Sequence, residues 1–325
     1  MPQNTHIELI ESEVERVPQG ASKATPDFAD LRRQAEELAP LLAWNPSVQT
    51  SAFFTVRWNA MAAVLRPLLE KVEKDGRSES ESDDHRWLRE NATLLWSQLS
   101  NTQNAFKSLN RLPHVSTPRG ITIPRAAGVA EAILHAVDFQ FSEEAFLAYL
   151  SAYQQLTVLK FSELWALIPS LELLLLEQTA ARGHKALENP ETPQKVGICV
   201  RSLRDISQLH WKDALDSQIA FDKILREDPA GAYSRMDFNS RDIYRARLVK
   251  IAENSDSTEM EVAQAALTLA RNAEKEGLLD ARQILRQSHV GYYLLGPGQE
   301  QLHAKVGFRP PLGWRIRHFL RTHPD

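Results

Sequence analysis

The sequence is short of the residues that build several kinds of site. It has one cysteine, Cys199, in 325 residues, which excludes an internal disulfide and any site that needs several thiolates. No Gly-rich loop ends in Lys-Ser or Lys-Thr, and the ten histidines never form a His-Glu-x-x-His motif. The short motifs of phosphate loops and zinc proteases are therefore missing. We expect no metal site, and we interpret Cys199 as a buried, unreactive thiol.

An excess of one charge and a long apolar run are missing as well. The 38 Lys and Arg residues against 42 Asp and Glu give a net charge of -4, which argues against a nucleic-acid-binding protein. The N-terminus is polar and acidic, unlike a secretory signal. The most apolar stretch, residues 164–176, is interrupted by Pro169 and Glu172, so we predict a buried core helix there. The composition indicates a soluble globular protein of a reducing compartment.

Helical spacing of apolar residues dominates the rest of the chain. Thr25-Pro26-Asp27 predicts a helix start with Thr25 as the cap, Ser142 predicts another cap, and Thr258 with Glu261 fits a capping box. Residues 112–124 hold three prolines and are expected to form an extended loop. We predict a mainly α fold, a multi-helix bundle or array, with at most a short strand near residues 290–295.

Polar segments divide the predicted helices into subdomains. Residues 1–24 are interpreted as a disordered acidic tail. Residues 25–182 form a predicted N-terminal helical subdomain with a polar linker at 75–84, and residues 183–195 form a second linker. Residues 196–325 form the predicted C-terminal helical subdomain.

The end of the chain, residues 303–325, is basic and aromatic. Such an end suits an anionic membrane surface or the cytoplasmic flank of a spanning helix. A short terminal helix with solvated arginines explains it equally well. The membrane-facing candidates are Arg309, Trp314, Arg315, Arg317 and Arg321.

Carboxylates and aromatic residues offer the remaining candidates for chemistry. Asp228 and Asp242 could act as an acid–base pair on a glycosidic bond if an open cleft held them about 5–10 Å apart. Helix capping explains Asp228 and Asp237 more simply. The aromatic residues, Trp165 and Tyr292 among them, are more often part of a core than of a sugar-stacking surface.

Several short segments together resemble the N-terminal region of the cyclic β-1,2-glucan synthases, which are large bacterial inner-membrane glycosyltransferases. The resemblance extends over roughly residues 50–325, and its segments are residues 87–91, 112–119, 152–157, 163–169, 202–211, 228–245, 289–294 and 322–324. The positions that it marks as family-motif or interaction candidates are Arg119, Tyr153, Glu163, Trp165, Asp228, Asp237, Arg241, Tyr244 and Tyr292.

The resemblance implies a role but no catalytic residue. Family members use UDP-glucose and a divalent metal in a membrane-embedded transferase domain, and the similar region looks like a cytosolic helical accessory domain. We therefore expect a non-catalytic module at the inner face of the bacterial inner membrane, with no cofactor of its own. Its expected partners are a membrane-embedded glycosyltransferase domain, in cis or in trans, and an anionic membrane surface, with no nucleic acid. The alternatives are a free-standing helical scaffold and a carboxylate-dependent glycoside-active enzyme.

Overall fold

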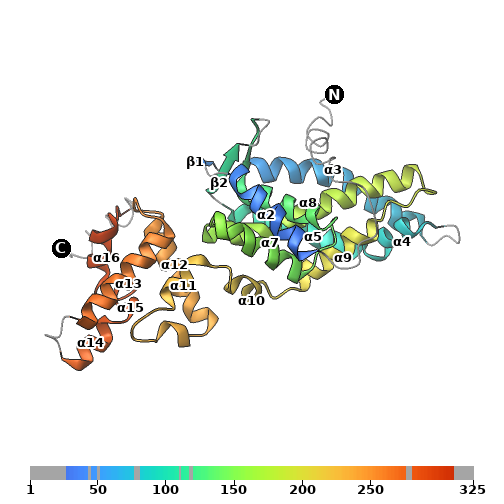
Figure 1. Ribbon diagram of the computed structural model, residues 1–325. Helices are drawn as coiled ribbons and strands as arrows, with labels where there is room; N and C mark the ends of the chain where they lie inside the picture. The colour runs from blue at the N-terminus through green and yellow to red at the C-terminus, as the bar shows by residue number, and fades with distance from the viewer. Residues whose placement is uncertain are drawn as a thin grey trace, which may run out of the picture.

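A computed structural model describes residues 27–310, apart from 43–44, 50–51, 77–80, 110, 117–119 and 276–279. The described chain is mainly α-helical, as the sequence predicts. The predicted acidic tail, residues 1–24, and residues 311–325 of the basic end lie outside this range. The helices gather into two lobes with α10 between them (Figure 1).

The larger lobe, called here the N lobe, is built around one long apolar helix. Its helices are α2 (Phe28–Leu41), α3 (Ala52–Asp75), α4 (Asp83–Glu90), α5 (Ala92–Ser108), α6 (Arg125–Ala136), α7 (Glu143–Leu156), α8 (Phe161–Glu188) and α9 (Val196–Gln208). Helix α8 packs against α3, α5, α6 and α9, and α2 packs on α7. By length and composition α8 could cross a membrane, but 67% of its apolar window is buried. It is the core helix that the sequence predicts.

The smaller lobe, called here the C lobe, is built from short helices around α13. It contains α11 (Ala220–Leu225), the 3-10 turn η1 (Tyr233–Arg235), α12 (Phe238–Ala252), α13 (Glu259–Lys275), α14 (Ala281–Gln287), α15 (Val290–Leu294) and α16 (Gln299–Val306). Helix α13 packs against α11, α12, α14, α15 and α16. Helix α10 (Trp211–Asp216) joins the two lobes (Figure 1).

Two helices begin at the capping residues that the sequence predicts. The N–H of Ala145 donates to the Ser142 hydroxyl at 3.3 Å, at the start of α7. The N–H of Glu261 donates to the Thr258 hydroxyl at 3.2 Å, and the Glu261 carboxylate accepts from the N–H of Thr258 at 2.7 Å, which completes the capping box of α13. Thr25, the cap predicted for the first helix, lies outside the described residues, and it is Asp27 that accepts from the N–H of Ala29 at 3.0 Å and caps α2.

The loop expected at residues 112–124 is instead part of a small antiparallel sheet. Its strands are β1 (Asn45–Gln49), β2 (Leu112–Ser116) and β3 (Thr122–Pro124), in that order across the sheet. Val115 pairs with Ile123, and His114 pairs with Pro124. Proline lacks an N–H but keeps a carbonyl that can accept, so the prolines are tolerated in a sheet of this size, where the β1–β2 register is already interrupted.

The strand predicted near residues 290–295 is wrong, because Val290–Leu294 is the helix α15. The first N–H of this helix, that of Val290, donates to the Asp228 carboxylate at 3.0 Å. Val290, Tyr293 and Leu294 then pack inward with 2% exposure or less. These tertiary contacts outweigh the β-propensity of the apolar and aromatic residues.

The boundary between the lobes also lies later than the predicted linker at 183–195. Helix α8 continues to Glu188, and α9 packs back onto α8 and α4. Residues 183–188 therefore belong to α8, and residues 189–195 connect α8 to α9 within the N lobe. The chain passes to the C lobe through α10 (Figure 1).

Candidate functional site

A buried ion pair joins the starts of α6 and α8. The Arg125 guanidinium donates to both carboxylate oxygens of Glu163, at 2.8 and 2.5 Å, and the two side chains are 4% and 0% exposed. Glu163 also accepts from the N–H of Lys160 at 2.9 Å. Burial works against the charge of Arg125, but its hydrogen bonds to Glu163 and the negative charge of that carboxylate together outweigh burial and raise the pKa of Arg125. The pair is a structural brace with no solvent-facing side.

Tyr153 and Trp165 lie in the same region of the N lobe. Tyr153 is fully buried, and its hydroxyl has no partner among the described residues. Burial raises the pKa of Tyr153 to about 12. The Trp165 ring meets the ring of Phe161 edge-on, with centroids 6.2 Å apart. The structure thus brings three candidates, Tyr153, Glu163 and Trp165, to one end of α8.

This end of α8 is also where the two lobes meet. The N–H of Phe161 donates to the Glu259 carboxylate at 3.0 Å, which joins α8 to α13. The Phe161 ring lies 6.1 Å from that of Phe221 in α11. The Gln154 amide donates to the carbonyl of Gln218 at 2.9 Å. Burial raises the pKa of the Glu259 carboxyl to about 7, although the hydrogen bond from Phe161 opposes the shift.

A carboxylate, an imidazole and a hydroxyl form a chain in the C lobe. Asp228 accepts from Nδ1 of His289 at 2.8 Å, and Nε2 of His289 lies 3.2 Å from the Tyr244 hydroxyl. The backbone N–H groups of Val290 and Tyr233 also donate to Asp228, at 3.0 and 3.1 Å. Burial opposes ionisation, but the hydrogen bonds from His289 and the backbone together lower the pKa of Asp228.

This chain of groups is enclosed. The Asp228 side chain is 0% exposed and that of His289 is 19% exposed. Its hydrogen bonds pin the start of α15 to the turn after α11, which is a structural task. The glycoside-active alternative requires an open cleft beside Asp228 and Asp242, whereas the Asp228 carboxylate is enclosed and already accepts hydrogen bonds from His289 and the backbone.

Two aspartates and two arginines tie α12 to its neighbours. Arg245 is fully buried and donates to Asp222 at 2.9 Å and to Asp216 at 2.6 Å. Arg241 lies 3.2 Å from Asp216. Burial opposes the charge of Arg245, but the two aspartates raise its pKa. Because Asp216 belongs to α10, this cluster holds the connecting helix to the C lobe.

The remaining candidates have separate positions. Asp237 caps α12 through the N–H of Ser240, at 3.0 Å. The Tyr292 ring meets that of Tyr293 edge-on at 5.1 Å. Arg309 pairs with Asp256 at 2.6 Å, with both side chains exposed. Four membrane-facing candidates and one motif candidate lie outside the described residues: Trp314, Arg315, Arg317, Arg321 and Arg119.

The sequence does not predict the partners of the buried charged residues. Nothing local marks Glu259 as the partner of Phe161 or Asp222 as the partner of Arg245, since each pair joins different helices. Arg125 and Arg245 brace the fold through ion pairs with Glu163 and Asp222. Cys199 is buried and unpaired, as predicted, and burial raises the pKa of its thiol to about 11.

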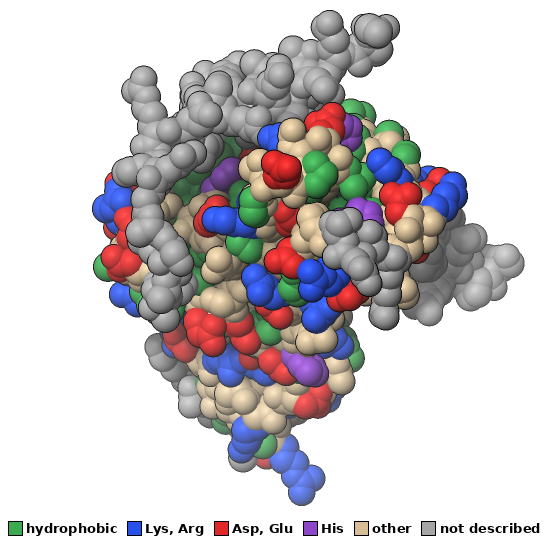
Figure 2. Space-filling model, turned by 90° about the vertical axis from the view of Figure 1, so that its right-hand side faces the viewer, with side chains coloured by type: hydrophobic (Ala, Val, Ile, Leu, Met, Phe, Trp, Pro, Cys, Tyr) green, Lys and Arg blue, Asp and Glu red, His purple; other side chains and the backbone are tan. Residues whose placement is uncertain are grey.

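The described residues contain no group of three or more His, Cys, Asp or Glu side chains that could hold a metal ion. They therefore offer no donor set for the divalent metal that the resemblance assigns to the family's transferase domain. On the end of the molecule shown in Figure 2, acidic and basic side chains of the described residues alternate without a broad area of one charge.

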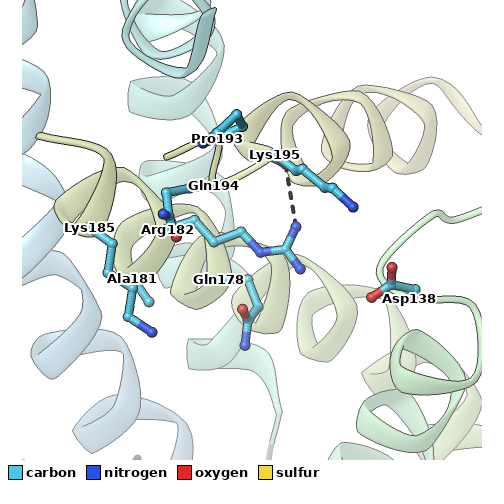
Figure 3. Close-up of a pocket in the computed structure, with 8 residues that line it drawn as sticks. All are labelled: Asp138, Gln178, Ala181, Arg182, Lys185, Pro193, Gln194 and Lys195. Atoms are coloured by element: carbon cyan, nitrogen blue, oxygen red, sulfur yellow. Dashed lines mark hydrogen bonds between the residues drawn. The ribbon is translucent and has the colours of Figure 1, made fainter. Parts of the chain in front are cut away.

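One open pocket of about 300 Å³ lies in the N lobe, away from all of these networks. Its walls are the C-terminal part of α8, the turn before α9 and the turn after α6. The lining residues are Asp138, Gln178, Ala181, Arg182, Lys185, Pro193, Gln194 and Lys195. Arg182 extends from α8 between Lys195 and Gln178, and Asp138 faces it from the other side (Figure 3). Three cations therefore share the pocket with one carboxylate.

Comparison with known proteins gives one partial relationship. No protein-family model matches the chain. A stretch of 123 residues, 38% of the chain, is 30% identical to the cyclic beta-(1,2)-glucan synthase NdvB of Rhizobium meliloti (strain 1021). That stretch covers 4% of the length of the synthase. Part of the chain is thus related to a small region of a cyclic glucan synthase, in agreement with the resemblance seen in the sequence.

Proposed function

We propose that this chain is a non-catalytic, helical accessory module of a glycosyltransferase related to the cyclic β-1,2-glucan synthases. The similarity to a region of such a synthase supports the relationship. The accessory role is inferred from the positions of the motif residues in the fold. Glu163, Asp228 and Arg241 lie in networks of ion pairs and hydrogen bonds that hold helices together, and Tyr153 is buried in the core.

The module acts by packing against a transferase domain, in cis or in trans, at the cytoplasmic face of the bacterial inner membrane. The basic residues of the C-terminal end would add attraction to an anionic lipid surface. UDP-glucose and the divalent metal would then be bound by the transferase domain.

An exposed apolar group on the N lobe suits such packing. Leu41, Leu156 and Val158 are 59%, 61% and 42% exposed at the adjoining ends of α2 and α7. The Thr157 hydroxyl lies 3.5 Å from the carbonyl of Ala39, which brings these two ends together. Large apolar side chains that gather on a surface mark sites of protein association more often than single ones do.

The activity test uses the purified chain with UDP-glucose and Mg²⁺ or Mn²⁺. The proposal expects no release of UDP above the rate without protein. Turnover by the chain alone would show that it is itself an enzyme and would refute the accessory role.

The association test co-expresses the chain with the transferase domain encoded in the same genome and measures co-purification. Leu156→Glu should weaken the association. Ile243→Glu is the matched control, because Ile243 lies on the C lobe and is 62% exposed, close to the value for Leu156. This variant should leave the association unchanged. Absence of co-purification with the wild-type chain would favour a free-standing scaffold instead.

A further inference from the structure

The pocket in Figure 3 is built on one face of a helix. Gln178, Ala181, Arg182 and Lys185 follow one another at the three- and four-residue spacing that places side chains on one side of α8. Lys195 and Gln194 close the opposite wall. The pocket therefore gathers two amides and three cations from segments that are rigidly joined through α8 and α9.

Within the part of the chain that the structure describes, no carboxylate pairs with the cations of this pocket. Among the described residues, Arg182, Lys185 and Lys195 form no ion pair within 4.0 Å, and Asp138 forms none either. The Arg125 guanidinium, by contrast, is matched by Glu163 at 2.5 Å. Three cationic side chains line one hollow, and an anion bound there would be attracted by all three.

The Arg182 guanidinium is already held in place. One of its amino groups donates to the carbonyl of Lys195 at 3.3 Å. Its guanidinium carbon lies 5.3 Å from the centre of the Phe139 ring, in a cation–π contact. A fixed guanidinium with further N–H groups free offers a fork of donors that suits a phosphate.

The backbone around the pocket is unusual for residues with side chains. Among the described residues other than glycine, those with positive φ are Arg111, Asp138, Phe139 and Lys195. Asp138 and Lys195 line the pocket, and the Phe139 ring contacts the Arg182 guanidinium. Left-handed backbone costs of the order of 1–3 kcal/mol at a non-glycine residue and is concentrated at functional sites. The α9 N-terminus does not explain the geometry, since Asp84 already accepts from Gln194 and Val196 there, at 2.5 and 2.7 Å.

We propose that this pocket binds a phosphate monoester. Its volume of about 300 Å³ is at the small end of ligand sites and suits a compact anion. The guanidinium of Arg182 and the ammonium groups of Lys185 and Lys195 bind the phosphate oxygens, and the Gln178 and Gln194 amides add neutral donors. The ester can be a free metabolite or a lipid headgroup, which share this chemistry. The proposal does not depend on the relationship to glucan synthases.

The proposal predicts the direction in which a substitution of Asp138 changes the affinity for an anion. Its carboxylate faces the cations without pairing with them, so it repels an anion in the pocket. Asp138→Asn removes that repulsion and should tighten binding about threefold. Lys185→Gln and Lys195→Gln should each weaken binding about tenfold, because each removes a charge-assisted hydrogen bond. Both lysines are exposed, so the fold does not depend on them.

The experiment is a calorimetric titration of the full chain with glycerol 3-phosphate, together with sedimentation on phosphatidylcholine vesicles that contain phosphatidic acid. Lys250→Gln, an exposed lysine of the C lobe, is the matched control and should bind like the wild type. Saturable binding of glycerol 3-phosphate that follows the predicted order of the variants supports a free ester as the ligand. Binding only to phosphatidic acid vesicles, with the same order of variants, supports the lipid headgroup.

Two results would overturn the proposal. One is the absence of binding to either probe. The other is binding that the two lysine variants retain in full or that Asp138→Asn weakens, because the charge of the pocket would then play no part.

Discussion

Glu259 at the junction of the lobes makes the stability of the protein depend on pH in a defined direction. In the unfolded chain its carboxyl ionises near pH 4.5, whereas in the folded protein burial raises the pKa to about 7. The groups that face it are the N–H of Phe161, the ammonium of Lys160, and the carboxylates of Glu163 and Glu253. The N–H and the ammonium favour the charged form, and burial outweighs them.

The sign of the effect follows from proton linkage. Below pH 4.5 the carboxyl is protonated in both states and contributes nothing. Between pH 4.5 and 7 only the unfolded state releases the proton, so stability falls as the pH rises and stays constant above pH 7. A shift in pKa from 4.5 to about 7 corresponds to a loss of about 3 kcal/mol.

The assay compares the free energy of unfolding in urea for the wild type and Glu259→Gln between pH 4.5 and 8. Glutamine cannot ionise, but its amide oxygen can still accept from the N–H of Phe161. The variant should therefore match the wild type at pH 4.5 and exceed its stability by about 3 kcal/mol at pH 8. Glu70→Gln, on an exposed part of α3, is the control and should follow the wild type. Parallel pH profiles for Glu259→Gln and the wild type would refute the reasoning.

Other buried groups make further predictions. Glu163→Gln leaves the Arg125 charge without its carboxylate at 4% exposure, so unfolding in urea should show a loss of about 3–5 kcal/mol. Adding Arg125→Met should recover part of this loss, and a single-variant loss below about 1 kcal/mol would contradict the brace. Gly197→Ala places a Cβ atom 2.6 Å from the Trp87 ring, which should cost about 1–3 kcal/mol in thermal unfolding; an unchanged melting temperature would show that the ring moves freely. Cys199 is fully buried and should react with a thiol reagent only after denaturation; rapid labelling of the native chain would show that it is accessible.

The elements that the sequence predicts well are those whose signals are local. Ser142 and Thr258 cap helices through groups within three residues, so their patterns are sufficient. The apolar composition of residues 164–176 likewise identifies a core helix, because burial is the main determinant of such a run.

The elements that it predicts poorly depend on contacts between distant segments. Val290–Leu294 has the composition of a strand but folds as a helix, because Asp228, from a different turn, accepts its first free N–H. The polar stretch at 183–195 looks like an interdomain linker, yet α8 continues into it and α9 returns onto α8. No pattern within either segment contains this information.

The candidate residues fall into two groups, those that hold the fold together and those that line the pocket. The segments that resemble the glucan synthases contain Glu163, Asp228 and Arg241, whose side chains are held in networks within the fold. A resemblance at such positions is what a shared framework would produce, because these side chains hold helices together. The pocket residues Arg182 and Lys195 lie outside those segments, and no carboxylate among the described residues pairs with either charge. A ligand bound there would therefore be a property of this chain in addition to the framework, and it could be tested even if the link to glucan synthesis proved wrong.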